Sequence, residues 1–195
     1  AEVERMLKQL PGWVLDGAKT WVLNGHAADQ IVVVARTAGG ARDAKGLSLF
    51  VVDGNAKGVE RLRVPGMDGQ RSALVTLRGA EVGADRLLGP EGGALPHLEW
   101  AIDRGAAAAC AEGQGSVQEL FERTVAYLKQ RVQFGVPIGS FQALQHKAAD
   151  MYAETELCKS SMYLAAIQAD AENDEERKAE ISAAKLQLTR GGWFV

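Results

Sequence analysis

The segment RVQFGVPIGSFQALQHKAADM, residues 131–151, connects two long stretches in which apolar residues recur every three or four positions. Connections between packed helices are usually short. This one contains an arginine, two phenylalanines, two glycines, a proline and three glutamines. The segment therefore marks the end of one helix and the start of another, and its composition suggests a further role.

Helix termination explains part of this segment. Arg131 places a positive charge at the C-terminus of the preceding helix, where it complements the helix dipole. Gly135 and Pro137 stop that helix, and Ser140 can cap the next one. None of these roles requires a ligand.

The other polar and aromatic residues of the segment fit a nucleotide site. Gln133 and Phe134 closely follow the arginine, and Phe141 and Gln142 open the next helix. A ligand with phosphates and an aromatic base would use such residues, because arginine binds phosphates, amides bind polar edges and a ring covers the base. A nucleotide site and a purely structural junction both remain open on these residues alone.

The regions around the segment have helical periodicity. The apolar face of the first helix consists of Leu98, Ile102, Ala106, Ala109, Gly113, Val117, Leu120, Thr124 and Leu128. The face of the second, over 141–170, consists of Phe141, Leu144, Ala148, Met151, Thr155, Cys158, Met162, Ala165 and Ala169. A third helix is expected over 175–190, capped by Asn173 or Asp174 and ended by Gly191-Gly192. Such stripes predict a helical bundle.

The first part of the chain has strand signals instead. WVLDGAKTWVLNG, residues 13–25, contains two short β-rich runs that a hairpin turn at Asp16-Gly17 would separate, closed by Asn24-Gly25. Frequent turns without an intervening helix predict an antiparallel sandwich or small barrel. Further apolar and β-branched runs occupy residues 30–37, 47–52, 59–64 and 72–79.

The predicted fold class is therefore α+β, with an antiparallel β sandwich or barrel followed by an antiparallel helical bundle. The β domain is expected over residues 11–90 and the helical domain over residues 91–195. Residues 1–10 are either a short amphipathic helix or a cloning remnant.

Composition excludes several classes of protein. The net charge of −3 is spread along the chain, which argues against nucleic-acid binding. No apolar run is long enough to span a membrane and no leader is recognised, so a cytoplasmic protein is expected. Cys110 and Cys158 belong to no CxxC pair and are expected to be reduced structural thiols. The three histidines have no metal-binding spacing, so no metal site is expected.

Residues 131–151 closely resemble a signature of the acyl-CoA dehydrogenase family, R-x-Q-F-G-x-P-I-x-x-F-Q-x-x-Q-x-x-x-A-D-M. Residues 12–37 (GWVLDGAKTWVLNGHAADQIVVVART) and 66–89 (GMDGQRSALVTLRGAEVGADRLLG) resemble stretches of the family's middle domain, in the family's order. The resemblance implies a middle β domain and a C-terminal four-helix domain, each incomplete in this chain.

Members of this family are flavoproteins, so the resemblance implies FAD as the cofactor. It implies that Arg131 and Gln133 contact the FAD pyrophosphate and that Phe134 lies near the adenine. Phe141 and Gln142 would complete this contact. In the family the junction serves the flavin of a neighbouring subunit, so a homo- or hetero-oligomer, a dimer or a tetramer, is implied.

The resemblance also assigns residues to the reaction centre. Trp21 matches a tryptophan packed beside the flavin ring. Leu23 replaces a threonine whose hydroxyl bonds the flavin near N5, and the backbone of Leu23 would still contact the ring. Arg104 matches a helix arginine of the substrate region. Asp103 occupies the position of the catalytic base in some members, with a shorter side chain. The alternative for Asp103 is an acid on the helix surface, or one that faces the CoA, paired with Arg104.

The implied function is FAD-dependent α,β-dehydrogenation of an acyl-CoA thioester, as in fatty acid metabolism, with electrons passed to an electron-transfer flavoprotein-type acceptor. The alternative is a non-catalytic or degenerate subunit that supplies FAD contacts to a partner subunit. Because the 195 residues resemble about the central half of a member, the chain alone is expected to be inactive.

Overall fold

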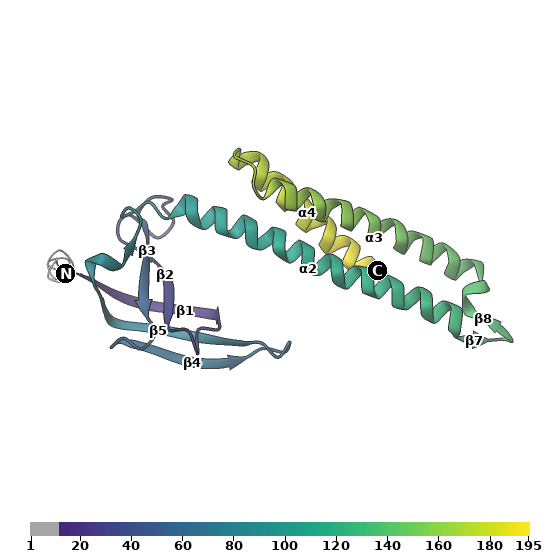
Figure 1. The fold of residues 1–195 in the computed structure, drawn as a ribbon, viewed down its shortest axis with the longest axis horizontal. Coiled ribbons are helices and arrows are strands. Elements are labelled where there is room, and N and C mark those ends of the chain that lie inside the picture. The colour runs from purple at the N-terminus through teal and green to yellow at the C-terminus, as the bar shows by residue number, and fades with distance from the viewer. Residues whose placement is uncertain (1–11) are drawn as a thin grey trace. The chain divides into compact units, whose positions relative to one another are not determined.

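The computed structural model describes residues 12–195, so the helix considered for residues 1–10 lies outside the described residues. The chain divides into a β unit that ends at Leu98 and a helical unit that begins at Glu99 (Figure 1). Antiparallel sheets followed by long helices confirm the predicted α+β class.

Within residues 12–98, the β unit contains two three-stranded antiparallel sheets whose inner faces share one core. The buried residues at its centre include Phe50, Val52 and Val75. The predicted strands are confirmed, although a short 3-10 helix at Ala84–Arg86 precedes the last strand. The sheets have the orders β1 (Trp13–Leu23), β5 (Arg71–Val82), β4 (Val59–Pro65) and β2 (Gln30–Arg36), β3 (Leu47–Asp53), β6 (Leu87–Leu88).

The hairpin predicted at Asp16-Gly17 is wrong, because β1 continues through both residues. The pairing of β1 with β5 shifts register between Leu15 and Gly17, as in a bulge. Gly17 takes a φ of 147°, and the Asp16 carboxylate accepts a hydrogen bond of 2.7 Å from the Gly79 amide. Asp16 and Gly17, which favour a turn, therefore form a bulge-like irregularity within one long strand.

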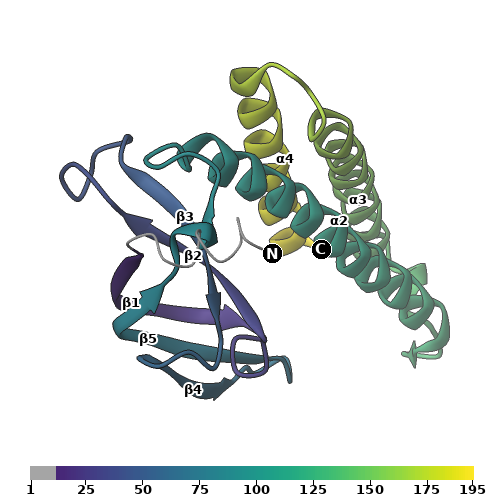
Figure 2. The ribbon, with the colours of Figure 1, turned by 60° about the vertical axis from the view of Figure 1, so that its left-hand side comes forward.

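Three long helices form the helical unit and lie side by side (Figures 1 and 2). A small hairpin and a 3-10 helix at Ile138–Ser140 join the first two helices. The other elements are α2 (Leu95–Gln130), β7 (Val132–Gln133), β8 (Val136–Pro137), α3 (Gln142–Gln168) and α4 (Asp174–Phe194).

The predicted apolar stripe is confirmed for α3 and only in part for α2, where Val117 is buried as predicted. In α3, Thr155, Cys158 and Ala165 are buried as predicted. In α2, Ile102 and Leu120 are instead exposed. The buried face of α2 includes polar side chains, which a search for apolar residues overlooks. It consists of Asp103, Ala107, Cys110, Gln114 and Val117.

Helix α4 begins as predicted and ends later than predicted. The Asn173 side chain caps it by accepting hydrogen bonds from the amides of Glu175 and Glu176. The helix continues through Gly191 and Gly192 to Phe194. Gly191 is buried against Cys158 of α3, so this glycine permits close helix packing rather than ending the helix.

Cys110 and Cys158 are free thiols buried in the helical core, as predicted. Burial raises the pKa of both thiols, which disfavours the reactive thiolate. Within residues 12–195, no cluster of histidine, cysteine and acidic side chains has the make-up of a metal site. Among the helices of that same range, none combines the length and the apolar character required to cross a bilayer.

Candidate functional site

The end of β1 presents Trp21 and Leu23 to solvent. Trp21 has a φ of 54°, and the β1–β5 register shifts between Lys19 and Val22. A positive φ is costly for a bulky residue and is found mainly where structure or function requires it. The residues are 63% and 68% exposed, respectively. The irregular backbone therefore projects two large apolar side chains outward.

Leu23 belongs to the outer face of its sheet. On β5, Ala73, Val75 and Leu77 point into the core, so the alternate residues point away from it. Ser72, directly opposite Leu23, is one of these outward residues. Beside them lies a hollow of about 370 Å³ that is lined by Trp21, Leu23, Gly66, Met67, Asp68, Gln70 and Ser72.

An arginine that the sequence motifs did not identify holds the turn after Leu23. The Arg61 guanidinium donates hydrogen bonds to the carbonyls of Ala28 (2.9 Å) and Gly25 (3.3 Å). Its other nitrogen donates to the Asn55 side chain at 2.8 Å. Arg61 thereby links the turn after β1 to the turn before β4 and restrains the end of β1.

The junction between α2 and α3 is a tight hairpin with an aromatic tip. Phe134 and Gly135, with φ values of 52° and 81°, connect β7 and β8. Positive φ at both central residues is typical of a type I′ turn. The Phe134 residue is 92% exposed, and its ring meets the edge of Phe141 at a centroid distance of 6.2 Å. The turn thus presents an aromatic pair to solvent.

The structure brings the predicted cofactor residues of the junction to this one end of the helical unit. Arg131 and Gln133 lie on one side of the hairpin tip, Gln142 is the first residue of α3, and all three are exposed. The predicted cap at Ser140 is wrong. Its hydroxyl bonds the carbonyl of Pro137, and Phe141 occupies the N-cap position of α3.

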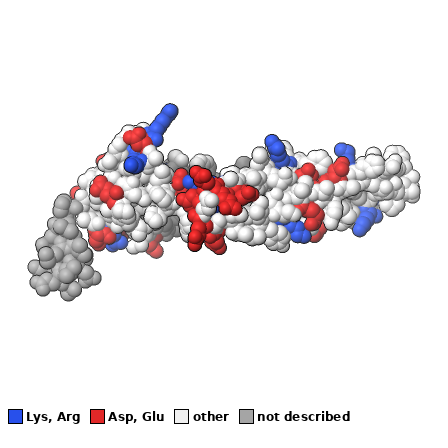
Figure 3. Space-filling view, turned by 90° about the horizontal axis from the view of Figure 1, so that it is seen from above, with Lys and Arg blue, Asp and Glu red and all other residues white. Residues whose placement is uncertain are grey.

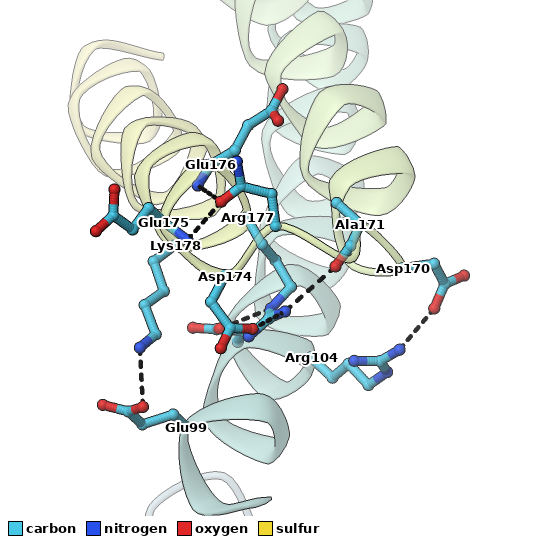
Figure 4. Close-up of polar contacts among 11 residues, drawn as sticks. Glu99, Arg104, Asp170, Ala171, Asp174, Glu175, Glu176, Arg177 and Lys178 are labelled. Carbon is cyan, nitrogen blue, oxygen red and sulfur yellow. Dashed lines mark hydrogen bonds and ion pairs between the residues drawn. The ribbon is translucent and has the colours of Figure 1, made fainter. Parts of the chain in front are cut away.

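Asp103 lies inside the helical unit, paired with Arg177 of α4. The Arg177 Nε atom is 2.9 Å from Asp103 Oδ2, and the two side chains are only 4% and 12% exposed. Arg177 also pairs with Asp174 at 2.6 Å and donates to the Ala171 carbonyl (Figure 4). The hydrogen bonds that Arg177 donates to Asp103 and Asp174 raise the pKa of Arg177. The suggested pairing of Asp103 with Arg104 at the surface is wrong.

Arg104 pairs with a different acid, Asp170. Its Nη2 atom donates to Asp170 at 2.7 Å, and the guanidinium lies 3.4 Å from the centroid of the Trp100 ring. Its Nη1 atom is enclosed and has no hydrogen-bond partner within the described residues. Acidic side chains gather at the nearby α3–α4 connection (Figure 3), and Asp174 and the two glutamates after it form the first turn of α4. The Arg104 side chain is therefore held by an aromatic face and one acid.

Comparisons with known proteins match both units. The family model described as acyl-CoA dehydrogenase, middle domain, matches residues 2–79, and the one described as acyl-CoA dehydrogenase, C-terminal domain, matches residues 95–195. The 2-methylacyl-CoA dehydrogenase, mitochondrial, of Solanum tuberosum is 33% identical over 201 residues, which cover 94% of this chain and 48% of that protein.

Two solved structures have the same fold. The structure of a glutaryl-coenzyme A dehydrogenase in complex with glutaryl-CoA has a TM-score of 0.77 at 26% identity, covering 95% of this chain and 49% of that one. Butyryl-CoA dehydrogenase from Megasphaera elsdenii has a TM-score of 0.77 at 25% identity, covering 93% and 49%. The chain thus spans about half the length of the relatives that it matches.

Proposed function

Because the chain belongs to the acyl-CoA dehydrogenase family, we propose that it takes part in FAD-dependent α,β-dehydrogenation of an acyl-CoA thioester. The observation that carries this proposal is the agreement between the family match and two exposed surfaces of the right chemistry. One is the apolar hollow at Trp21 and Leu23, and the other is the hairpin tip around Phe134. Electrons would pass to an electron-transfer flavoprotein-type acceptor.

The exposed residues fit the two ends of FAD. The hollow beside Trp21 and Leu23 is largely apolar, which suits a flavin ring. When bound, FAD supplies the acceptor for the substrate hydride. Arg131 would neutralise the pyrophosphate, Gln133 and Gln142 would bind polar edges, and the Phe134–Phe141 pair would cover the adenine. We place the hairpin tip on the flavin of a second subunit, so the active form is a homo- or hetero-oligomer.

The substrate side is proposed at the start of α2. Arg104, held between Trp100 and Asp170, would meet the acyl-CoA there. Asp103 is the candidate base by position in the family, and its Oδ2 is already bonded to Arg177. A base must have a free lone pair within reach of the substrate proton. The other oxygen of Asp103 is the one that would act as the base without breaking the ion pair.

A second candidate function follows from Leu23 and Asp103. Leu23 has no hydroxyl to offer a flavin, and Arg177 occupies one oxygen of Asp103. Both features fit a non-catalytic subunit that supplies its junction residues to the FAD of a partner. The Phe134 hairpin, which is fully formed and exposed, would suffice for that role.

Full-length protein in its oligomeric form should bind FAD and lose flavin absorbance on addition of an acyl-CoA, because dehydrogenation reduces the flavin, whereas the 195 residues alone should show no turnover. Absorbance near the flavin maximum, followed with a set of acyl-CoA chain lengths and an artificial electron acceptor, measures this. FAD binding without bleaching favours the non-catalytic subunit, which co-expression with an active family member would then reveal. Absence of any bound flavin contradicts both functions.

Replacing Arg131 with alanine should weaken FAD binding about tenfold or more, since a charge-assisted contact to the pyrophosphate is lost. Flavin fluorescence titration of wild-type and variant protein measures the change. Lys129, a neighbouring cation within α2, provides the matched control, and Lys129→Ala should bind FAD as the wild type does. Equal affinity of Arg131→Ala and wild type would leave the junction with only a structural role.

A further inference from the structure

Ser72 is a buried serine on the outer face of the β unit. It lies on β5 between Leu23 of β1 and Val64 of β4, its partners across the sheet. The residue is only 6% exposed, although its strand neighbours on the other face, such as Ala73, fill the core. Ser72 is therefore enclosed by side chains on the surface of the sheet, at the wall of the hollow beside Trp21.

The Ser72 hydroxyl has no hydrogen-bond partner among residues 12–195, and its oxygen is not one of the fully enclosed unpaired atoms. The hydroxyl oxygen therefore keeps some exposed surface, and Ser72 is one of the residues that line the hollow. Another buried serine of the same unit differs. Ser48 bonds the Thr37 hydroxyl at 2.9 Å and accepts from the Gly92 amide at 2.8 Å. A buried hydroxyl is normally satisfied in this way.

The wall around Ser72 is mostly apolar, and its other polar residues are Asp68 and Gln70. Leu23, directly opposite, contributes no hydroxyl, and Trp21 and Met67 add further apolar surface. A pocket of this kind holds a ligand by apolar contact and orients it with a few polar groups. A hydroxyl both donates and accepts, so it can meet either kind of atom at the polar edge of a ring.

We propose that the Ser72 hydroxyl forms a hydrogen bond to the polar edge of the flavin ring and fixes its orientation against Trp21 and Leu23. This inference rests on the proposed function, because it takes FAD as the ligand. It adds a cofactor-binding residue that lies outside the junction motif and 49 positions away from Leu23 in the chain. The antiparallel pairing of β1 and β5 brings the two together.

Ser72→Ala should weaken FAD binding about three- to tenfold, which corresponds to the loss of one neutral hydrogen bond. The dissociation constant from flavin fluorescence and the visible spectrum of the bound flavin measure the effect without any need for turnover. Ser72→Thr keeps a hydroxyl and should bind within about twofold of the wild type. Thr76→Val is the matched control, because Thr76 lies on the same face of β5 but does not line the hollow.

The outcomes separate this inference from the proposed function. If wild-type protein binds FAD and Ser72→Ala binds it equally well, with the same spectrum, the role of Ser72 is overturned and the proposed function stands. If wild-type protein binds no FAD, both are overturned. Equal weakening by Thr76→Val would also overturn the inference, since the effect would then come from the sheet. If Ser72→Ala does not fold, Ser72→Cys replaces it, because the thiol preserves the shape of the side chain and is a weaker hydrogen-bonding group.

Discussion

Replacing Asp103 with asparagine should lower the thermal unfolding midpoint by about 10 °C, because it leaves the buried Arg177 without its buried counter-charge. The remaining acid, Asp174, has a side chain that is 63% exposed and cannot replace Asp103 inside the bundle. Circular dichroism at 222 nm during heating measures the midpoint. The loss should be smaller than about 3 °C for Asp174→Asn, the matched control on the same guanidinium.

The pH dependence of this effect follows from the raised pKa of Arg177. A group with a raised pKa in the folded state contributes its full stability below the unfolded value and loses it only as pH rises through the folded value. Arginine titrates far above neutral pH. The difference between wild type and Asp103→Asn should therefore stay constant from pH 7 to pH 9. A difference that vanished in this range would contradict the assignment of the ion pair.

The same variant separates a catalytic role for Asp103 from a structural one. If Asp103 is the base, Asp103→Asn loses flavin bleaching by acyl-CoA even at temperatures where it is fully folded. If Asp103 only joins α2 to α4, the folded variant keeps its rate and loses only stability. Lys178→Met, which breaks the partly exposed pair with Glu99 at the same end of the unit, should change neither the rate nor the midpoint greatly.

Gly191→Ala should destabilise the helical unit by about 1–3 kcal/mol, whereas Gly192→Ala should be neutral or stabilise it by up to about 1 kcal/mol. A Cβ atom on Gly191 overlaps the Cys158 sulfur and approaches a Glu154 carboxylate oxygen to 3.2 Å. The nearest atom to a Cβ on Gly192 is a Val117 methyl at 3.5 Å, which is ordinary contact. We therefore expect the two substitutions to change the free energy of unfolding in opposite directions.

Urea denaturation of the two variants, monitored by helical circular dichroism, compares them under one condition. Alanine has a higher helix propensity than glycine, so without the clash both substitutions would stabilise α4. Similar stabilisation by both would show that α4 does not pack closely on α3 at Gly191. The double variant Gly191→Ala, Cys158→Ala should recover part of the loss, because the sulfur that the new methyl meets is removed.

The local sequence pattern was sufficient to predict the buried face of a helix where that face is apolar and continuous. The α3 stripe includes Thr155, Cys158 and Ala165, which are buried at the predicted positions because every residue of that face is small or apolar. The predicted α2 stripe was only partly correct, because Asp103 and Gln114 belong to the buried face together with Val117. Asp103 is buried only through Arg177, which is 74 positions away in the chain, and no local period reveals such a partner.

The sequence by itself determined the family and the α+β class, because motif segments and hydrophobic periods are continuous stretches of the chain. The assignment of the junction residues to FAD stays a prediction. Tertiary structure alone decided the surroundings of the other candidate residues. The pairing of Arg177 with Asp103, and the position of Ser72 opposite Leu23, depend on helix packing and strand register. These bring together residues that are far apart in the chain, and the energy of such contacts exists only in the folded state.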